Sequence, residues 1–361
     1  MTSKHQNYRF LLMLLALVTL TAATWAGLLR LGWPWPAIQP QLPISHGPLM
    51  VAGFFGTLIS LERAVAMGKA WAYLGPLMSG LGGILLAFGV PGLAGPVLIM
   101  LGSAWLVLIF GIVLQKHRVG YLLVMALGAV ALLVGNLLWL FGWQVHQFVL
   151  WWAGFLILTI AGERLELGRM IQKPTYSQPL FFGITVLYLA GLVVMLFSWD
   201  LGIRITGAGM LGLAFWLLRF DIARQTVLQT GLTRYIAISL LSGYLWLVVA
   251  GGVALAYGGF PAGPVYDTIL HAIFLGFVFA MIFGHAPIIF PAVLELDIEY
   301  KSYFYIPLIF LHLSLAFRTA GEMAGLGWAR LWGGLVNVLA VMLYLGMISP
   351  LWKRLERASS G

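Results

Sequence analysis

The sequence predicts an all-helical integral membrane protein, and three observations carry that prediction. Of the 361 residues, 61% are hydrophobic and only 9% carry a charge, whereas about 25% of the residues of an ordinary soluble domain are charged. Apolar stretches recur along the whole chain at about 20 residues, the length that a helix needs to cross the hydrocarbon core. The alternating stretches of about 10 residues that are typical of membrane strands do not occur in the sequence.

Twelve apolar stretches alternate with short breaks that contain turn-forming residues such as Pro34, Pro174 and Gly325. The predicted spans are 9–29, 46–67, 72–90, 94–115, 120–141, 146–164, 178–198, 203–219, 234–257, 267–290, 303–320 and 330–351. Because none of the breaks is long enough for a soluble domain, we expect one transmembrane domain over residues 1–361.

The first span resembles the apolar part of a signal peptide, because Lys4 and Arg9 precede it. It has no small-x-small cleavage pattern at a suitable distance, and its length suits a membrane crossing. We therefore expect it to remain in the protein as a helix.

The 20 Lys and Arg residues are distributed unevenly between the two sides of the predicted bundle. If the N-terminus is cytoplasmic, the opposite loops hold only four of them: Arg30, Arg204, Arg318 and Arg330. The others, which include Lys353, Arg354 and Arg357, fall on the cytoplasmic side, as the positive-inside rule requires. We expect a bacterial-type inner membrane protein with both termini cytoplasmic, and no nucleic-acid partner despite the net charge of +9.

The absence of cysteine limits the metal chemistry that the chain can support. No cysteine is present, which excludes thiolate ligands, iron–sulfur clusters held by cysteine and covalent haem attachment through CxxCH. Any metal must be held by His, Met or carboxylate side chains, and histidine is the ligand that we favour.

Three histidines each begin a predicted span, four helices apart, on the side opposite the termini: His46, His146 and His271. A Gly-Phe pair follows each of them: Gly53-Phe54, Gly154-Phe155 and Gly276-Phe277. The spacing predicts three four-helix pseudo-repeats, roughly 1–119, 120–232 and 233–361. Histidines at equal depth in a membrane bundle are costly and usually functional.

His46 and His271 are the strongest candidates for the two axial ligands of one haem, because neutral imidazoles on facing helices can bind an iron from opposite sides. Small residues would leave room for a macrocycle near each histidine: Gly47, Ala52, Gly53, Ala272 and Gly276. The alternative is that both are solvated histidines at helix starts with no function.

His146 occupies the matching position in the middle repeat. It would hold a second metal such as copper, or relay protons, and the alternative is an exposed histidine beside Gln144 and Gln147.

His285 lies 14 residues after His271, about 21 Å deeper at helical rise, and His312 is in the middle of the next span. The two would meet as a pair or line a proton path. The alternative is that each imidazole only forms hydrogen bonds with neighbouring carbonyls or hydroxyls. Glu62, in the dipeptide Glu62-Arg63, is a candidate proton entry point, although an interfacial ion pair is the simpler interpretation of that dipeptide and of Glu163-Arg164.

Arg318 stands near the outer end of its span, where the topology disfavours a lone cation. It would pair with Glu322 one turn later, or bind the propionates of a haem.

The chain resembles two known families at these residues. Twelve helices in three arcs, with His46-Gly47 and Met50 beginning the second span and His271 in the tenth, resemble subunit I of the haem–copper oxidases. That resemblance implies that His46 and His271 bind a low-spin haem and that His146 is nearest to a copper ligand. The seventh span contains none of that family's histidines, so most ligands of the oxygen-reducing centre are missing.

The chain is more similar to the NnrS-like haem proteins of the nitric oxide response, through the stretches 46–54, 271–285 and 312–318. This resemblance implies a haem, b-type when no cysteine attaches it, and binding or detoxification of a diatomic gas, or electron transfer at the outer face. Two other functions stay open. One is a proton-coupled transporter without a prosthetic group, and the other is an assembly factor for a respiratory complex. The sequence does not identify the redox partner that electron transfer would require.

Overall fold

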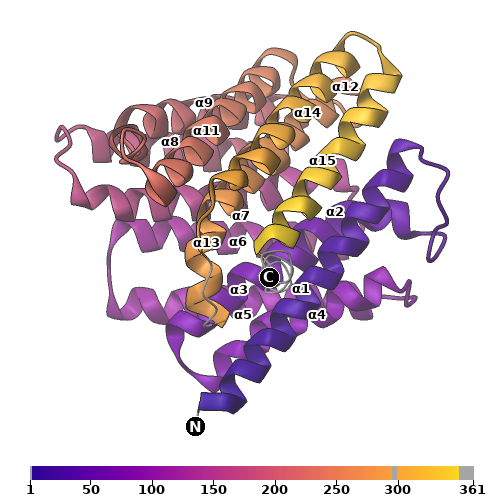
Figure 1. Cartoon of the computed structure of the whole chain (residues 1–361), viewed down its shortest axis with the longest axis horizontal. Helices are drawn as coiled ribbons and strands as arrows, with labels where there is room; N and C mark the ends of the chain where they lie inside the picture. The colour runs from indigo at the N-terminus through magenta and orange to yellow at the C-terminus, as the bar shows by residue number, and fades with distance from the viewer. Residues whose placement is uncertain (1, 295–298, 349–361) are drawn as a thin grey trace, which may run out of the picture. The chain divides into compact units, whose positions relative to one another are not determined.

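The computed structural model describes residues 2–294 and 299–348, and all of its regular elements are helices over that part of the chain (Figure 1). Predicted features at the C-terminal end, namely residues 349–351 of the last span and Lys353, Arg354 and Arg357, lie outside the described residues.

In the described residues, twelve helical segments are long and apolar enough to cross a membrane, which confirms the number of spans predicted from the sequence. They are Tyr8–Leu31, Leu42–Met67, Ala70–Ala87, Ala94–Lys116, Gly120–Leu140, Val145–Met170, Ser177–Val194, Trp199–Phe220, Gly231–Tyr257, Pro264–Leu294, Ser302–Met323 and Gly327–Ile348. The chain therefore has the helices of a multi-pass membrane protein.

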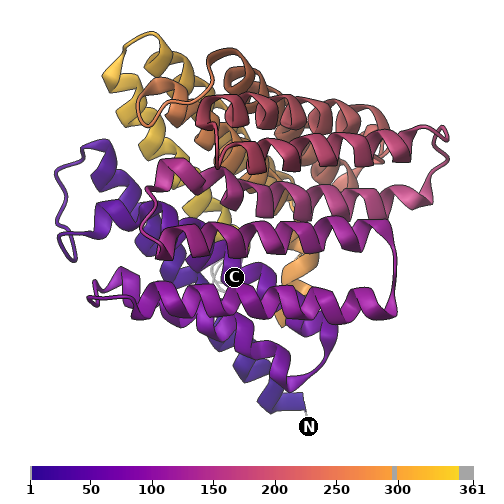
Figure 2. The same cartoon turned by 180° about the vertical axis from the view of Figure 1, so that it is seen from behind.

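The chain divides into two compact units, Met1–Glu163 and Arg164–Gly361, and the boundary falls within α7 (Val145–Leu167). In the first unit, α4 (Leu74–Ala87) packs against α5 (Ala94–Lys116), which packs against α6 (Gly120–Leu140). Figure 2 shows α5 and α6 side by side and joined by a short turn. α1 (Thr2–Leu31) contacts α4 and the second span.

In the second unit, α8 (Ser177–Val194), α9 (Trp199–Phe220) and α11 (Gly231–Tyr257) pack in sequence order (Figure 1). The remaining spans are α12 (Pro264–His271) with η5 (Ala272–Phe279) and α13 (Ala280–Leu294), then α14 (Tyr305–Met323) and α15 (Gly327–Ile348). α11 contacts α12, η5 and α13, while α14 contacts α12 and α15. This packing brings the ends of α12, α14 and α15 together. Short helices complete the chain: η3 (Ala70–Tyr73), η4 (Gly168–Met170), α10 (Ala223–Thr226) and η6 (Ser302–Phe304).

The second and tenth spans share a backbone feature that sequence periodicity did not predict. After η1 (Leu42–Ser45) and α2 (His46–Pro48), the second span continues as the π-helix η2 (Leu49–Phe55) and then as α3 (Gly56–Met67). In the tenth span, η5 is also a π-helix and begins directly after His271. π-Helical turns are rare and occur frequently at functional sites. Each of these two contains one of the repeated Gly-Phe pairs.

Candidate functional site

His46 lies against α1 in the first unit, and the contact fixes its tautomer. Its Nδ1 is 2.7 Å from the carbonyl oxygen of Ala23, and because a carbonyl can only accept, Nδ1 must carry the proton. A Cβ on Gly27 would lie 2.9 Å from both Nδ1 and Cε1 of the ring, so this glycine makes space for the imidazole. In the neutral ring, Nε2 is then the nitrogen with the lone pair. The second span begins one turn before His46, at Leu42 rather than at the predicted residue 46.

His271 ends α12 in the second unit, one turn after Asp267. Gly263, at φ 91°, and Pro264 begin this helix, an arrangement in which proline at the first position needs no hydrogen-bond donor. Asp267 falls in the first turn, where a carboxylate is favourable to the helix dipole. The Nδ1 of His271 is 2.9 Å from the Asp267 carbonyl oxygen and 3.2 Å from its carboxylate Oδ1. Both groups are acceptors, so the proton again sits on Nδ1 and the lone pair on Nε2.

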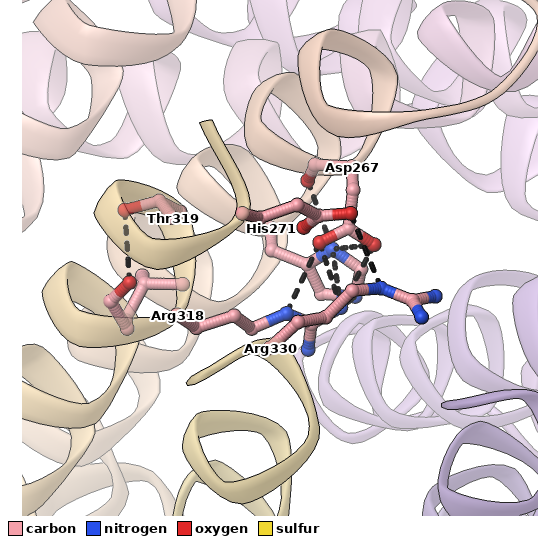
Figure 3. A network of polar contacts seen from close by, with 7 residues as sticks. Asp267, His271, Arg318, Thr319 and Arg330 are labelled. Carbon is pink, nitrogen blue, oxygen red and sulfur yellow. Dashed lines mark hydrogen bonds and ion pairs between the residues drawn. The ribbon is translucent and has the colours of Figure 1, made fainter. Parts of the chain in front are cut away.

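Arg318 covers the face of the His271 ring (Figure 3). Its Nη2 is 3.3 Å from Nδ1 and 3.3 Å from Nε2 of the imidazole. A group that is equally far from the two ring nitrogens and lies in the ring plane would collide with Cε1 between them. The guanidinium therefore lies over the ring, and the in-plane lone pair of Nε2 is not used by Arg318.

The partner of Arg318 is Asp267, not Glu322 as one interpretation of the sequence expected. Arg318 Nε is 3.0 Å from Oδ2, and Nη2 is 2.8 Å from both Oδ1 and Oδ2 of Asp267. Glu322 binds Arg330 instead, with Oε1 3.1 Å from Nε. The physical reason is that α12 packs against α14 and places a carboxylate closer to the guanidinium than residues one turn apart on α14 can. Figure 3 shows this network at the ends of three helices.

His312 has the opposite tautomer from His46 and His271. Its Nδ1 accepts a hydrogen bond from the indole Nε1 of Trp246 on α11, at 2.9 Å. An indole N–H can only donate, so in the neutral ring the proton of His312 is on Nε2. That Nε2 is buried and has no partner among the described residues. A neutral His312 held in this way cannot use Nε2 as a metal ligand.

His285 donates through Nδ1 to the carbonyl of Met281, at 2.8 Å, one turn earlier on α13. A hydrogen-bonded pair of His285 with His312, one of the alternatives that the sequence left open, is not formed in the described part of the chain. Nδ1 of His312 bonds to Trp246 on α11, and its Nε2 has no hydrogen-bond partner there.

The other predicted site residues lie in the first unit. His146 is the second residue of α7 and is partly exposed, next to Gln147, whose side chain accepts from the backbone of Gln144. Nη2 of Arg63 is 2.7 Å from Oε1 of Glu62 and 2.5 Å from Oε1 of Glu163. Glu62 is thus part of an ion pair. His46 and His146 belong to the first unit and His271 to the second. Within the described residues no group of three or more His, Asp or Glu side chains is arranged to hold a metal ion.

Sequence reasoning missed Asp267 and Trp246. Asp267 carried a usable signal, because a carboxylate one turn before a histidine in an apolar span faces the same side of the helix. No pattern in the sequence pointed to Trp246, since only packing brings α11 against η5 and α14. The ring of Trp246 lies against Gly276, where a Cβ would be 2.3 Å from its Cγ.

The fold and site define a multi-pass, all-helical membrane protein in which His46 and His271 each donate to a backbone carbonyl and are each followed by a π-helical segment. The chain belongs to the family described as Domain of unknown function (DUF8744), which matches residues 9–352. No curated protein and no solved structure is similar enough to match it.

Proposed function

We propose that this chain is a haem-binding membrane protein of the nitric-oxide-response or oxidase-subunit-I type, in which His46 and His271 would hold the haem iron through Nε2. One observation carries the proposal. Both histidines donate Nδ1–H to a backbone carbonyl, which is the arrangement that metal-binding histidines commonly use to fix their tautomer and orientation.

The donor set fits a haem better than a bare metal ion. A haem brings four ligands of its own and needs only one or two imidazoles, so a cluster of three protein ligands is not required. With no cysteine in the sequence, the haem would not be attached covalently through CxxCH, and we propose a b-type haem. Asp267 occupies Nε and Nη2 of Arg318, so a propionate near Arg318 would bind its Nη1 side.

When bound, haem supplies an iron that takes up a diatomic gas or exchanges an electron. In the proposal the twelve spans form the three four-helix pseudo-repeats of the oxidase-subunit-I type, in a bacterial-type inner membrane with both termini cytoplasmic. The ligand histidines then belong to the outer side, and His146 is the residue that would hold a copper ion there. The residues themselves orient the ligands: Ala23 and Gly27 hold His46, and Asp267 and Arg318 hold His271.

The test is the haem content of the full-length protein, purified in detergent after expression with added haem precursor. We expect an intense Soret band in the wild type, and a strongly reduced or reshaped band in His46→Ala and His271→Ala. The matched control is His285→Ala, because His285 makes the same type of Nδ1 bond to a carbonyl but is not a proposed ligand. Carbon monoxide difference spectra separate gas binding from electron transfer. A wild type without haem would refute the proposal.

One observation favours proton-coupled transport as a second candidate. The buried Nε2–H of His312 has no acceptor among the described residues, and ionisable groups inside membranes often mark proton or substrate paths. Under this alternative the protein is colourless, and proteoliposomes show proton uptake that His312→Gln abolishes. Haem in the purified wild type, together with proton uptake unaffected by His312→Gln, would exclude this alternative.

A further inference from the structure

We infer that Asp267 and Arg318 are positioning residues for His271, and that the Asp267 carboxylate, held in place by Arg318, makes this imidazole a stronger electron donor than a carbonyl bond alone would. The expected effect on a bound haem rests on the proposed function. The contacts among Asp267, His271 and Arg318 do not depend on whether the protein binds haem.

Asp267 contacts the Nδ1–H of His271 with two acceptors from one residue. The backbone oxygen is at 2.9 Å and the carboxylate Oδ1 is at 3.2 Å. The corresponding acceptor for Nδ1 of His46 is the neutral carbonyl of Ala23. A carboxylate that accepts from Nδ1–H increases the electron density on Nε2 and raises the basicity of the ligand.

Arg318 fixes that carboxylate in place. Three contacts of 2.8 to 3.0 Å join its Nε and Nη2 to the two oxygens of Asp267, and a two-pronged pair of this kind restricts both partners. The same Nη2 lies over the imidazole. The ring is therefore held at its edge by Asp267 and on its face by Arg318, and the Arg318 side chain is 5% exposed.

The neighbouring pair of Glu322 with Arg330 provides a matched control within the same network. Glu322 also has a carboxyl group, is also mostly buried and also pairs with an arginine. It contacts Asp267, but its ion-pair partner is Arg330 rather than the His271 ring. Asp267→Asn and Glu322→Gln each replace a carboxyl group by an amide of the same shape. Only the first removes the carboxylate acceptor from the Nδ1 of His271.

With haem bound, the experiment is a spectroelectrochemical titration and a low-temperature EPR spectrum of the full-length wild type, Asp267→Asn and Glu322→Gln. A less basic imidazole stabilises ferric iron less well, so Asp267→Asn raises the midpoint potential by more than Glu322→Gln does. We also expect it to change the low-spin g values, which Glu322→Gln leaves unchanged. Equal shifts in both variants with unchanged g values would show that Asp267 acts only as a charge, and would overturn the inference.

A second measurement uses the haem-free protein and separates failure of this inference from failure of the proposed function. In protein labelled with 15N-histidine, the ring signals of His271 are assigned by their loss in His271→Gln. We expect Asp267→Asn to shift them and Glu322→Gln to leave them in place. If Asp267→Asn does not fold, Arg318→Lys replaces it, because it keeps the charge and removes the cover over the ring. A folded variant with His271 signals identical to the wild type would overturn the inference, whether or not the protein binds haem.

Discussion

The Nη2 of Arg318 lies 3.3 Å from both ring nitrogens of His271, while the same guanidinium forms a two-pronged ion pair with Asp267. A histidine near the end of one span is thereby joined to a cation from the next. His271 is therefore part of a network of charged side chains rather than an isolated side chain.

Replacing Arg318 by Gln leaves the Asp267 carboxylate without its cation. Removing one partner of a buried ion pair costs about 3–5 kcal/mol, and we expect the lower end here because Asp267 keeps 15% of its side-chain surface exposed. Arg330→Gln is the control, since Arg330 is 34% exposed. Thermal unfolding in detergent should show a clearly larger loss for Arg318→Gln. A smaller loss than that of Arg330→Gln would contradict the network as described.

The second prediction concerns the space that Gly27 leaves for His46. In Gly27→Ala, the new Cβ would approach within 2.9 Å of the ring, so the imidazole must move and its bond to Ala23 must weaken. We expect the Soret band to lose intensity or shift while the protein remains folded. Gly111→Ala is the control, because a Cβ there meets nothing within 4 Å. Identical spectra for Gly27→Ala and the wild type would remove His46 from the ligand assignment.

Trp246→Phe tests the tautomer of His312. The substitution removes the only N–H that bonds Nδ1 of His312 in the described part, which allows the proton to occupy either ring nitrogen. We expect the 15N signals of His312 to move toward a mixture of tautomers and the protein to lose about 1 kcal/mol of stability. Trp105→Phe loses a comparable indole bond, to the Trp71 carbonyl, and should leave the histidine signals in place. Unmoved His312 signals in Trp246→Phe would show that the indole does not set the tautomer.

The fourth prediction is structural and does not depend on haem. Arg164 and Asp221 form an ion pair in which the side chains are 4% and 0% exposed, and Asp221 also accepts from Tyr244. Arg164→Ala leaves a buried charge uncompensated, so we expect a loss of about 3–5 kcal/mol. The exposed pair of Arg169 with Glu166 should contribute less than about 1 kcal/mol, as surface pairs usually do. Similar melting temperatures for Arg164→Ala and Arg169→Ala would contradict the burial of the first pair.

The sequence predicted the all-helical fold and the number of spans because hydropathy and span length are local properties that packing does not alter. It could not predict the π-helices after His46 and His271, since the extra residue per turn is a response to packing and leaves no periodic signal. Span ends were less accurate: the tenth span begins at Pro264 instead of residue 267.

The candidate histidines were found from the sequence because an imidazole in an apolar span is conspicuous. The tautomers of these histidines could not be predicted from the sequence, because they depend on atoms from other helices or earlier turns. Those atoms are the Ala23 carbonyl for His46 and the Trp246 indole for His312. The choice of Asp267 over Glu322 as the partner of Arg318 likewise depends on how α12 packs against α14.

The most direct test of the central claim is the EPR spectrum of the oxidised, haem-loaded protein, compared with those of His46→Ala and His271→Ala. If both histidines are axial ligands, the wild type gives a low-spin ferric signal, and each substitution replaces it with a high-spin signal or eliminates it. A low-spin signal that persists unchanged in either variant would contradict the account.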